Sequence, residues 1–337
     1  MRVGIMGCGR IGRNVFRLLA DHPTLEVSAV VDTADPKGLA YLLKYDSIYG
    51  RFPGELTSTD GGVLLNGREI PFTQDREPGD ADWEALGVDL VVQALPKYHT
   101  GDWMEAHLKR GAKRVVMAST PETLGDVPLL LWGVNDDILS QDSRVIALGS
   151  NTSNALAPIL SILDRRFGIA QATFTSVHAF TNKQRLADVP TSGFRTSRAA
   201  AENIIPSETN SPAILEFVLP ELAGKIRGMA LNVPVSDGST VDLVAVLETP
   251  TSVEGINEVV REEISSRYPK IIEYIEDPIV SSDVTGTTHS GQFDSLATLV
   301  LGETMAKLIV WFDNGWGYAN RIVETLEVFE KFEEGSA

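Results

Sequence analysis

Cysteine is almost missing from this chain of 337 residues, in which Cys8 is the single example. One cysteine cannot close an internal disulfide, so the sequence excludes a disulfide-stapled fold and favours a reducing compartment. Histidine is also scarce, and the histidines form no H-x₃-H or H-x-x-E-H cluster of the kind that binds zinc, so we expect no bound metal. The five histidines are His22, His99, His107, His178 and His289.

Long hydrophobic runs and an excess of basic residues are missing as well. No apolar run reaches the roughly 18 residues of a transmembrane helix, and residues 1–5 enter a folded motif directly, so we expect a cytoplasmic protein. The net charge of −17 disfavours nucleic acid and anionic membranes as partners, although it also suits an ordinary soluble surface. An anionic substrate would therefore need a local basic pocket.

The length and the 43% hydrophobic content predict two domains. Residues 2–6 form a buried apolar run, 10–20 show helical spacing, and 25–31 form a second apolar run, which together indicate a βαβ unit. Further apolar runs and one helix continue this alternation at residues 89–95, 100–110, 114–118, 129–132 and 145–148. We therefore expect an α/β fold, with a doubly wound Rossmann domain over residues 1–150.

The pattern changes after residue 150. Residues 153–166, 211–219 and 253–268 read as helices, and long alternating runs at 172–180, 227–234, 240–249 and 306–311 read as strands. These features predict an α+β domain over 151–315 with a mostly antiparallel sheet covered by helices on one face. A closing helix at 316–332, within the C-terminal stretch 316–337, is expected to return to the first domain. The polar stretch 181–203 is long enough to suggest a functional segment.

The first turn reads G-x-G-x-x-G, with glycines at Gly7, Gly9 and Gly12 and with Arg10 and Ile11 between them. Such a turn lets the backbone approach a pyrophosphate, and the following helix N-terminus offers N–H groups to its oxygens. The carboxylate of Asp32, at the end of the second strand, suits the adenosine ribose hydroxyls and repels a 2′-phosphate. We expect NAD as cofactor; NADP stays open because Thr33 and Ala34 are small and neutral, and the turn could also be purely structural.

The segment 149–158 reads G-S-N-T-S-N-A-L-A-P and resembles S-C-T-T-N-C-x-A-P of glyceraldehyde-3-phosphate dehydrogenase. The resemblance covers nearly the whole chain and keeps that family's order of motifs. The matching motifs are G-x-G-R-I-G-R at 7–13, Y-L-L-K-Y-D-S-I-Y-G-R-F at 41–52, V-H-A-F-T-N-K-Q at 177–184, R-A-A-A-E-N-I-I-P at 198–206, V-L-P-E-L-x-G-K at 218–225 and W-F-D-N-G-W-G-Y-A-N-R at 311–321. The chain is identified as a divergent member of this family.

The resemblance implies chemistry that depends on a nucleophilic cysteine and a histidine base. His178 matches the histidine, but Asn151 stands at the cysteine position, and a carboxamide nitrogen is not a useful nucleophile. Thr152 and Ser153 are displaced by one and two positions, which would misplace a nucleophile against the nicotinamide. Cys8 belongs to the pyrophosphate turn. The resemblance therefore predicts that this chain is not a phosphorylating aldehyde dehydrogenase.

The anion-binding residues implied by the family are only partly kept. Lys183 stands where the family has aspartate, and Asn232 stands where it has arginine. The family's T-G-A-A-K becomes T-N-S-P-A at 209–213, which loses a lysine. The matching positions that remain are Ser150, Thr152, Thr181, Arg195 and Thr209. We expect poor binding of a bisphosphorylated product, while Lys183 leaves room for one phosphate or carboxylate.

The cofactor residues implied by the resemblance are better kept. Asn314, Tyr318 and Ser119 match residues on the nicotinamide side, whereas Gln93–Pro96 replaces the family's E-S/C-T-G turn. The family is typically a homotetramer, and residues 181–203 resemble its subunit-bridging loop. We therefore expect a homotetramer whose partner is a small-molecule substrate.

Two functions remain open from the sequence. The first is a repurposed NAD-dependent oxidoreductase that transfers hydride to or from a small carbonyl or alcohol, with His178 as acid/base and Asn151 as a donor to the substrate oxygen. The second is a catalytically silent NAD-binding protein with a regulatory or scaffold role, in which His178 is an inherited residue hydrogen-bonded within a dead site. The sequence alone does not name the substrate.

Overall fold

A computed structural model describes residues 1–182 and 184–335 of the chain. The chain divides into two compact units, which are described separately below. The N-terminal unit contains Met1–Leu130, Asp136–Gly149 and the chain from Ala319, and the second unit contains Leu131–Asn135 and Ser150–Tyr318. Among the described residues, no helix is both long and apolar enough to span a bilayer.

The N-terminal unit is built on an eight-stranded sheet of order β10-β9-β8-β1-β2-β7-β6-β5. Its central strands are parallel and carry a glycine turn and helix after β1, as the sequence predicts. This confirms the Rossmann domain. The strands are β1 (Arg2–Met6), β2 (Glu26–Val31), β5 (Leu56–Ser58), β6 (Gly62–Leu65), β7 (Arg68–Thr73), β8 (Leu90–Gln93), β9 (Arg114–Met117) and β10 (Val145–Ala147). The helices are α1 (Arg10–Leu19), α2 (Pro36–Lys44), α3 (Gly101–Lys109) and the 3₁₀ turn η1 (Asp136–Ile138).

Two details of this unit differ from the prediction. The run at residues 129–132 forms one bridge, from Leu129 to Ala147, and no strand. Antiparallel pairs join β5 to β6 and β6 to β7, so one edge of the sheet is mixed. A two-stranded ribbon of β3 (Tyr45–Asp46) and β4 (Gly50–Arg51) follows α2. β3 and β4 have two residues each, too few to show alternation, and α2 was not predicted from the sequence.

A buried chain of hydrogen bonds crosses the core of this unit. Trp83 Nε1 donates to His107 Nδ1 at 2.9 Å, and His107 Nε2 lies 2.9 Å from Gln93 Oε1. Gln93 Nε2 then donates to the carbonyl of Tyr98 at 2.7 Å. Because Nδ1 accepts, Nε2 carries the proton and the imidazole is neutral, and burial lowers the pKa of His107 to about 3. The network fixes the end of β8 and the loop after it.

Replacing His107 by alanine is expected to destabilise the protein by about 3 kcal/mol or more, since it leaves a cavity and two unpaired buried groups. The folded-state pKa lies below the ordinary value of 6.5, so the stability from the neutral ring is present above pH 6.5 and is lost as the pH falls toward 3. Urea unfolding followed by tryptophan fluorescence measures the free energy of unfolding. The difference in this free energy between the variant and the wild type should become smaller as the pH falls. His99→Ala serves as control and should cost about 1 kcal/mol or less, because among the described residues the ring of His99 makes one hydrogen bond, to the carbonyl of Leu95. Equal losses of stability in His107→Ala and His99→Ala would contradict the structural role of His107.

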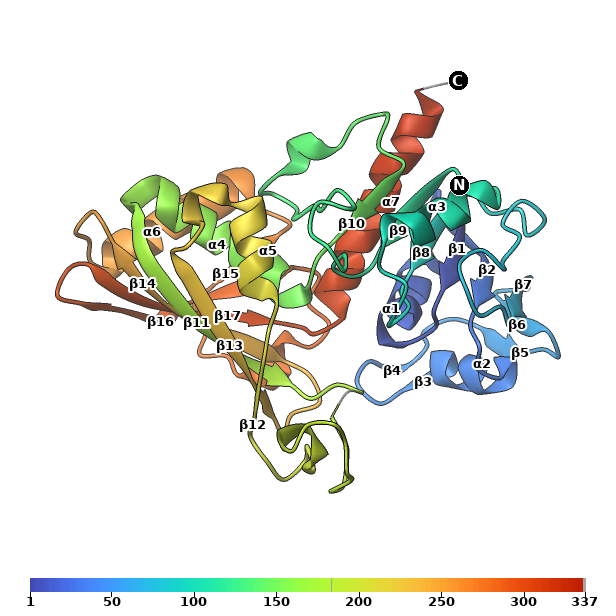
Figure 1. Ribbon diagram of the computed structural model, residues 1–337, viewed down its shortest axis with the longest axis horizontal. Coiled ribbons are helices and arrows are strands. Elements are labelled where there is room, and N and C mark those ends of the chain that lie inside the picture. Colours follow the sequence, from blue (N-terminus) through green and yellow to red (C-terminus); the bar gives the residue numbers. More distant parts are fainter. Residues whose placement is uncertain (183, 336–337) are drawn as a thin grey trace. The chain divides into compact units, whose positions relative to one another are not determined.

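The second unit contains a seven-stranded sheet of order β12-β13-β11-β14-β17-β16-β15, with helices on one face (Figure 1). Inward and outward residues alternate strictly along β14, which explains why one face is covered. The strands are β11 (Ile169–Ala179), β12 (Ile205–Ser207), β13 (Ile226–Val233), β14 (Ser239–Leu247), β15 (Ile272–Ile275), β16 (Gly291–Leu301) and β17 (Met305–Phe312). The helices are α4 (Asn151–Phe167), α5 (Ser211–Val218) and α6 (Val253–Arg267), with the 3₁₀ turns η2 (Arg195–Ser197), η3 (Pro220–Leu222) and η4 (Ser281–Val284).

The mostly antiparallel sheet is confirmed, with two exceptions. β11 pairs with β13 in parallel, and β15 pairs with β16 in parallel, so the sheet is mixed. The helix expected at 153–166 begins earlier, at Asn151, because Ser150 caps it by accepting the N–H of Ser153. The last helix, α7 (Trp316–Glu334), starts in this unit and continues into the N-terminal unit.

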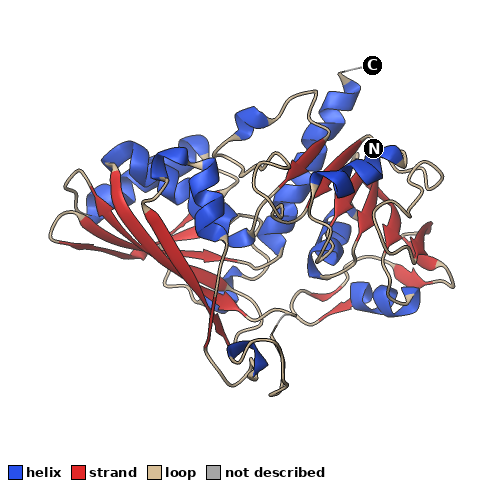
Figure 2. Cartoon of the chain, in the orientation of Figure 1, coloured by secondary structure: helices blue, strands red, loops and turns tan. Residues whose placement is uncertain are grey.

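The polar stretch 181–203 is mainly loop in Figure 2, with η2 as its one helical turn among the described residues. Backbone bonds such as Val189 N–H to Ser197 O and Ala200 N–H to Arg185 O hold its two sides together. Lys183, predicted to take part in an anion site, lies outside the described residues.

Candidate functional site

The glycine turn after β1 has the geometry of a dinucleotide-binding turn. Gly7 has a φ of +96°, and a Cβ there would lie 2.6 Å from the carbonyl oxygen of Ala94. A Cβ on Gly12 would lie 2.0 Å from the carbonyl oxygen of Gly7, so only glycine allows this approach of helix and turn. A Cβ on Gly9, the N-cap of α1, would meet no atom within 4 Å. The space above Gly9 and the N-terminus of α1 suits a pyrophosphate.

Asp32 directly follows β2 and faces the same turn. Its Oδ2 accepts the N–H of Cys8 at 2.7 Å, and its Oδ1 accepts the N–H of Ala34 at 2.9 Å. Each carboxylate oxygen keeps a further lone pair for a ribose hydroxyl. Ser119, which follows β9, has a buried hydroxyl without a hydrogen-bond partner among the described residues. The open space at Gly9 and this unpaired hydroxyl show that the residues present fit a bound dinucleotide.

Cys8 is buried within the turn and is not a nucleophile. Its side chain is 2% exposed, and desolvation raises the pKa of the thiol to about 12. Iodoacetamide at neutral pH is therefore expected to leave the folded protein unmodified and NAD binding unchanged. Intact mass spectrometry checks this, with a urea-unfolded sample as the control that gains one adduct. An adduct on the folded protein would show that this thiol is reactive after all.

The ends of four neighbouring strands bring the predicted site residues His178, Asn232 and Asn314 to one edge of the second sheet. His178 precedes the end of β11, Asn232 pairs with it on β13, and Asn314 follows the end of β17. Ser239, at the start of β14, pairs with Phe312 of β17. Because β14 is antiparallel to both β11 and β17, its first residues meet their last residues.

A directed hydrogen-bond chain orients Asn314 and His178. The N–H of Ala179 donates to Ser239 Oγ at 2.9 Å, and that hydroxyl donates to Asn314 Oδ1 at 2.8 Å. The amide nitrogen of Asn314 is thereby turned toward the ring of His178, 3.3 Å from Nδ1 and 3.4 Å from Nε2. His178 Nδ1 lies 2.7 Å from the carbonyl of Ala179. A carbonyl only accepts, so Nδ1 carries the proton in the neutral ring and Nε2 keeps the lone pair that a base needs.

Asn151 is the first residue of α4 and bonds the same Asn314. Its Oδ1 accepts the N–H of Thr152 at 2.8 Å, and its Nδ2 donates to the carbonyl of Asn314 at 2.8 Å. The carboxamide nitrogen has two N–H groups, so a second donor is left for another oxygen. The structure thus joins Asn151 and His178 through Asn314, as neutral groups that can donate and accept a proton or hydrogen bond.

Two hydroxyl and amide networks contain most of the predicted anion residues. At the starts of α4 and α5, Ser150 Oγ lies 2.7 Å from Ser153 Oγ and 3.3 Å from Ser211 Oγ, and Thr209 Oγ1 donates to Ser211 Oγ at 3.1 Å. Thr152 is buried beside them in the first turn of α4. These side chains are all uncharged and bond one another.

The second network surrounds Asn232. Its Oδ1 accepts from Ser207 Oγ at 2.7 Å and from Gln184 Nε2 at 3.4 Å, and Gln184 Oε1 accepts from Thr181 Oγ1 at 2.9 Å. Arg195 lies on η2, is exposed, and shares no side-chain hydrogen bond with either network among the described residues. The predicted residues Thr181 and Asn232 are thus brought together as a neutral network, and Arg195 is not part of it.

Tyr318 lies in the first turn of α7 and is buried, and desolvation raises the pKa of its phenol so that it remains a neutral donor.

Sequence reasoning missed Gln184, Ser207 and Ser239. Each is a polar residue at a strand end or loop start, a signal too common to single out. Among the described residues, no group of three or more His, Cys, Asp or Glu side chains could hold a metal ion.

Comparisons with known proteins match both units. Residues 1–101 match the model for the NAD-binding domain of glyceraldehyde 3-phosphate dehydrogenase, and residues 150–314 match the model for its C-terminal domain. Glyceraldehyde-3-phosphate dehydrogenase of Geobacillus stearothermophilus is 41% identical over 96% of each chain. That of Thermotoga maritima is 42% identical over 98% of this chain and 99% of its own, and that of Podospora anserina is 39% identical over 99% and 98%.

Proposed function

This chain belongs to the glyceraldehyde-3-phosphate dehydrogenase family, and from that premise we propose that it is an NAD-dependent oxidoreductase that transfers hydride without a covalent thioester. NAD is its cofactor, in keeping with the family's NAD-binding domain. The observation that carries the proposal is the pairing of Asn151 with His178 through Asn314. It supplies a donor and a base but no thiol.

When bound, NAD accepts or returns a hydride at C4 of its nicotinamide ring. Gly7, Gly9, Arg10, Ile11 and Gly12 hold the pyrophosphate in this proposal, with Asp32 on the adenosine ribose. On the nicotinamide side, Asn314 keeps one amide N–H and a lone pair on Oδ1 for the carboxamide. In the N-terminal unit, Ser119 offers to the cofactor its buried hydroxyl, which is unpaired within the part of the chain that the structure describes.

His178 takes the proton from an alcohol, or returns it to a carbonyl oxygen, through Nε2. The Nδ1–H bond to Ala179 supports this because it holds the lone pair on Nε2. Asn151 donates its second N–H to the same oxygen and stabilises the charge that develops there. Neither residue bonds covalently to the substrate, so this reaction needs no inorganic phosphate to release a product.

The substrate is a small carbonyl or alcohol without a phosphate group. Asn232 supports this because its buried oxygen accepts from Ser207 and Gln184 instead of presenting a cation. Ser150, Ser153, Thr209 and Ser211 likewise satisfy one another. A phosphate dianion placed against such neutral networks would lose more hydration than they return.

Absorbance of NADH with a panel of alcohols, aldehydes and ketones tests the proposal, beside glyceraldehyde 3-phosphate with and without inorganic phosphate. Turnover of an uncharged member, independent of phosphate, is the expected result. Phosphate-dependent oxidation of glyceraldehyde 3-phosphate would contradict it. If no substrate of the panel were turned over while NAD still bound, the result would instead favour the second function, a catalytically inactive NAD-binding protein.

We also infer that the chain assembles as a homotetramer. The side chains of Phe194 and Leu186, in the loop between β11 and β12, are 96% and 75% exposed. Large apolar side chains exposed so fully in one loop are typical of a surface that another subunit covers. Light scattering of the purified protein measures the particle mass and should give four times that of one chain.

A further inference from the structure

Two acidic side chains meet behind Asn314 in the second unit. Asp237 lies just before β14 and Asp313 just after β17, and the pairing of Ser239 with Phe312 brings these two positions together. The side chains are 4% and 2% exposed. Two carboxyls are seldom buried so close to each other without a basic partner, because each charge opposes the other.

The contacts of the pair show where a proton resides. Asp313 accepts three backbone hydrogen bonds. Its Oδ1 accepts the N–H groups of Gly315 at 2.7 Å and Trp316 at 2.5 Å, and its Oδ2 accepts that of Gly286 at 2.7 Å. Asp237 Oδ1 accepts the N–H of Asn314 at 3.0 Å. Asp237 Oδ2 is buried without a hydrogen-bond partner among the described residues. Asp313 is therefore the carboxylate, and Asp237 Oδ2 is the atom that carries a proton.

The charge of this pair changes near neutral pH. Burial, and next the charge of Asp313, raise the pKa of Asp237 to about 7. The other titratable groups around it are few. His178 meets the side chain of Asn314, and on η4, whose backbone packs against Gly238, Asp283 is exposed and bonds the N–H of Val280. Among the described residues, no lysine or arginine contributes to the pKa of Asp237.

We propose that the Asp237–Asp313 pair sets the preference of the nicotinamide subsite for oxidised over reduced cofactor. The nicotinamide ring of NAD⁺ carries a positive charge and that of NADH carries none, so a buried negative charge behind Asn314 stabilises the oxidised form. The preference is larger when both carboxyls are ionised, and binding of NAD⁺ releases the proton of Asp237 to solvent. This inference rests on the proposed role of Asn314 at the nicotinamide.

Calorimetric titration with NAD⁺, NADH and ADP-ribose across pH about 6 to 8 measures the effect. In the wild type, the ratio of the Kd of NADH to that of NAD⁺ should rise at least about fivefold over this range. ADP-ribose lacks the nicotinamide, so its Kd should follow no such trend. In Asp237→Asn the ratio should stay flat and low, because the amide keeps the acceptor for Asn314 N–H and cannot ionise.

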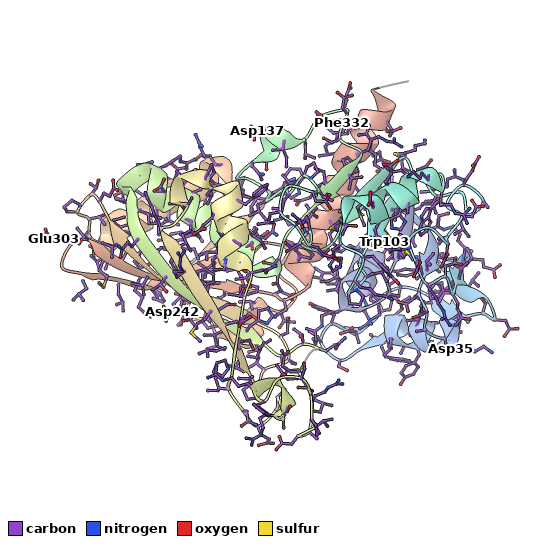
Figure 3. The ribbon with its side chains drawn as sticks, viewed as in Figure 1. Asp35, Trp103, Asp137, Asp242, Glu303 and Phe332 are labelled. Atoms are coloured by element: carbon purple, nitrogen blue, oxygen red, sulfur yellow. The ribbon has the colours of Figure 1, made fainter. Side chains whose placement is uncertain are left out.

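Two variants separate this pair from other titrating groups. His178→Gln should keep the rise with pH, and so should Asp242→Asn. Asp242, labelled in Figure 3, lies on β14 like Ser239, and its carboxyl pairs with Lys307 of β17. A rise lost in His178→Gln but kept in Asp237→Asn would overturn the proposal, as would a flat ratio in the wild type. The wild type also supplies a test without substitution, since NAD⁺ should release more protons than NADH at pH about 7.

The experiment distinguishes this inference from the proposed reaction. A ratio that rises with pH in a protein that turns over no substrate would support the pair's role and contradict the reaction. Turnover of a substrate together with a Kd ratio that does not change with pH would support the reaction and contradict the pair's role. If neither NAD⁺ nor NADH bound, the inference would fail together with the assignment of Asn314.

Discussion

His178→Ala is expected to lower kcat by about 10²- to 10⁴-fold, the usual contribution of a positioned acid or base. The loss follows from the Nε2 lone pair, which the Nδ1–H bond to the Ala179 carbonyl preserves. Binding of NAD should persist in the variant, because the ring contacts Asn314 only at 3.3–3.4 Å, while Ser239 holds Asn314 from the other side. Steady-state NADH absorbance, with Kd for NAD from calorimetry, separates the two effects.

His289→Ala is the matched control for this prediction. His289 is also a half-buried histidine of the second unit, but its ring lies 3.7 Å from Glu273 and makes no hydrogen bond to Asn314, Asn151 or Ser239. It should change kcat little. Full activity in His178→Ala would remove the acid/base role and leave His178 as an inherited side chain in a silent site.

Asn151→Ala is the second large effect, with an expected loss of about 10²- to 10³-fold in kcat, as for removal of a single oxyanion donor. The variant loses the N–H offered to the substrate oxygen and also the 2.8 Å bond to the Asn314 carbonyl. Asn151→Asp should be at least as slow, since it keeps the acceptor for Thr152 N–H but places a carboxylate oxygen against that carbonyl. Kinetics of both variants on the best panel substrate measure these losses.

Asn257→Ala controls for the loss of an asparagine as such. Asn257 on α6 donates to Ser295 O and accepts from Thr298 Oγ1, so its amide both donates and accepts, as that of Asn151 does, in another part of the unit. Its removal should affect stability and not kcat. Asn151→Cys instead places a thiol at the position of the family's cysteine. Phosphate-dependent oxidation of glyceraldehyde 3-phosphate by that variant would show that the neutral networks around Asn232 and Ser150 still bind anions.

The cofactor half of the site could be predicted from local sequence. The turn at Gly7–Gly12, α1 and β2 follow one another in the chain, and their periodicity and glycine spacing determine them without distant contacts. In the second unit, alternation predicted β11, β13, β14 and β17, because one face of each is covered.

Alternation does not say which strands are neighbours or in which direction they pair. The parallel pairing of β11 with β13 was therefore missed, although it places Asn232 beside His178. β16 was missed because its register shifts between Asp294 and Leu299, which interrupts the period of two. β12 and β15 are too short to give a periodic signal.

The polar network behind the site was missed for the same reason. Ser239, Asp237 and Asn314 are distant in the chain, and they converge only through the register of β14 with β17. The resemblance indicated Asn314 and His178 but gave no reason to choose Ser239 or Asp237. These residues became visible as a group once their hydrogen bonds to Asn314 were known.

The most direct test of the central claim is the intact mass of the protein, quenched during steady-state turnover of the best panel substrate with NAD. Hydride transfer from the substrate to NAD, with His178 as the base and Asn151 as the hydrogen-bond donor, predicts that the protein keeps the mass of the unmodified chain while NADH accumulates, with or without inorganic phosphate. A mass increased by an acyl group from the substrate, which phosphate removes, would show a covalent intermediate and contradict this account.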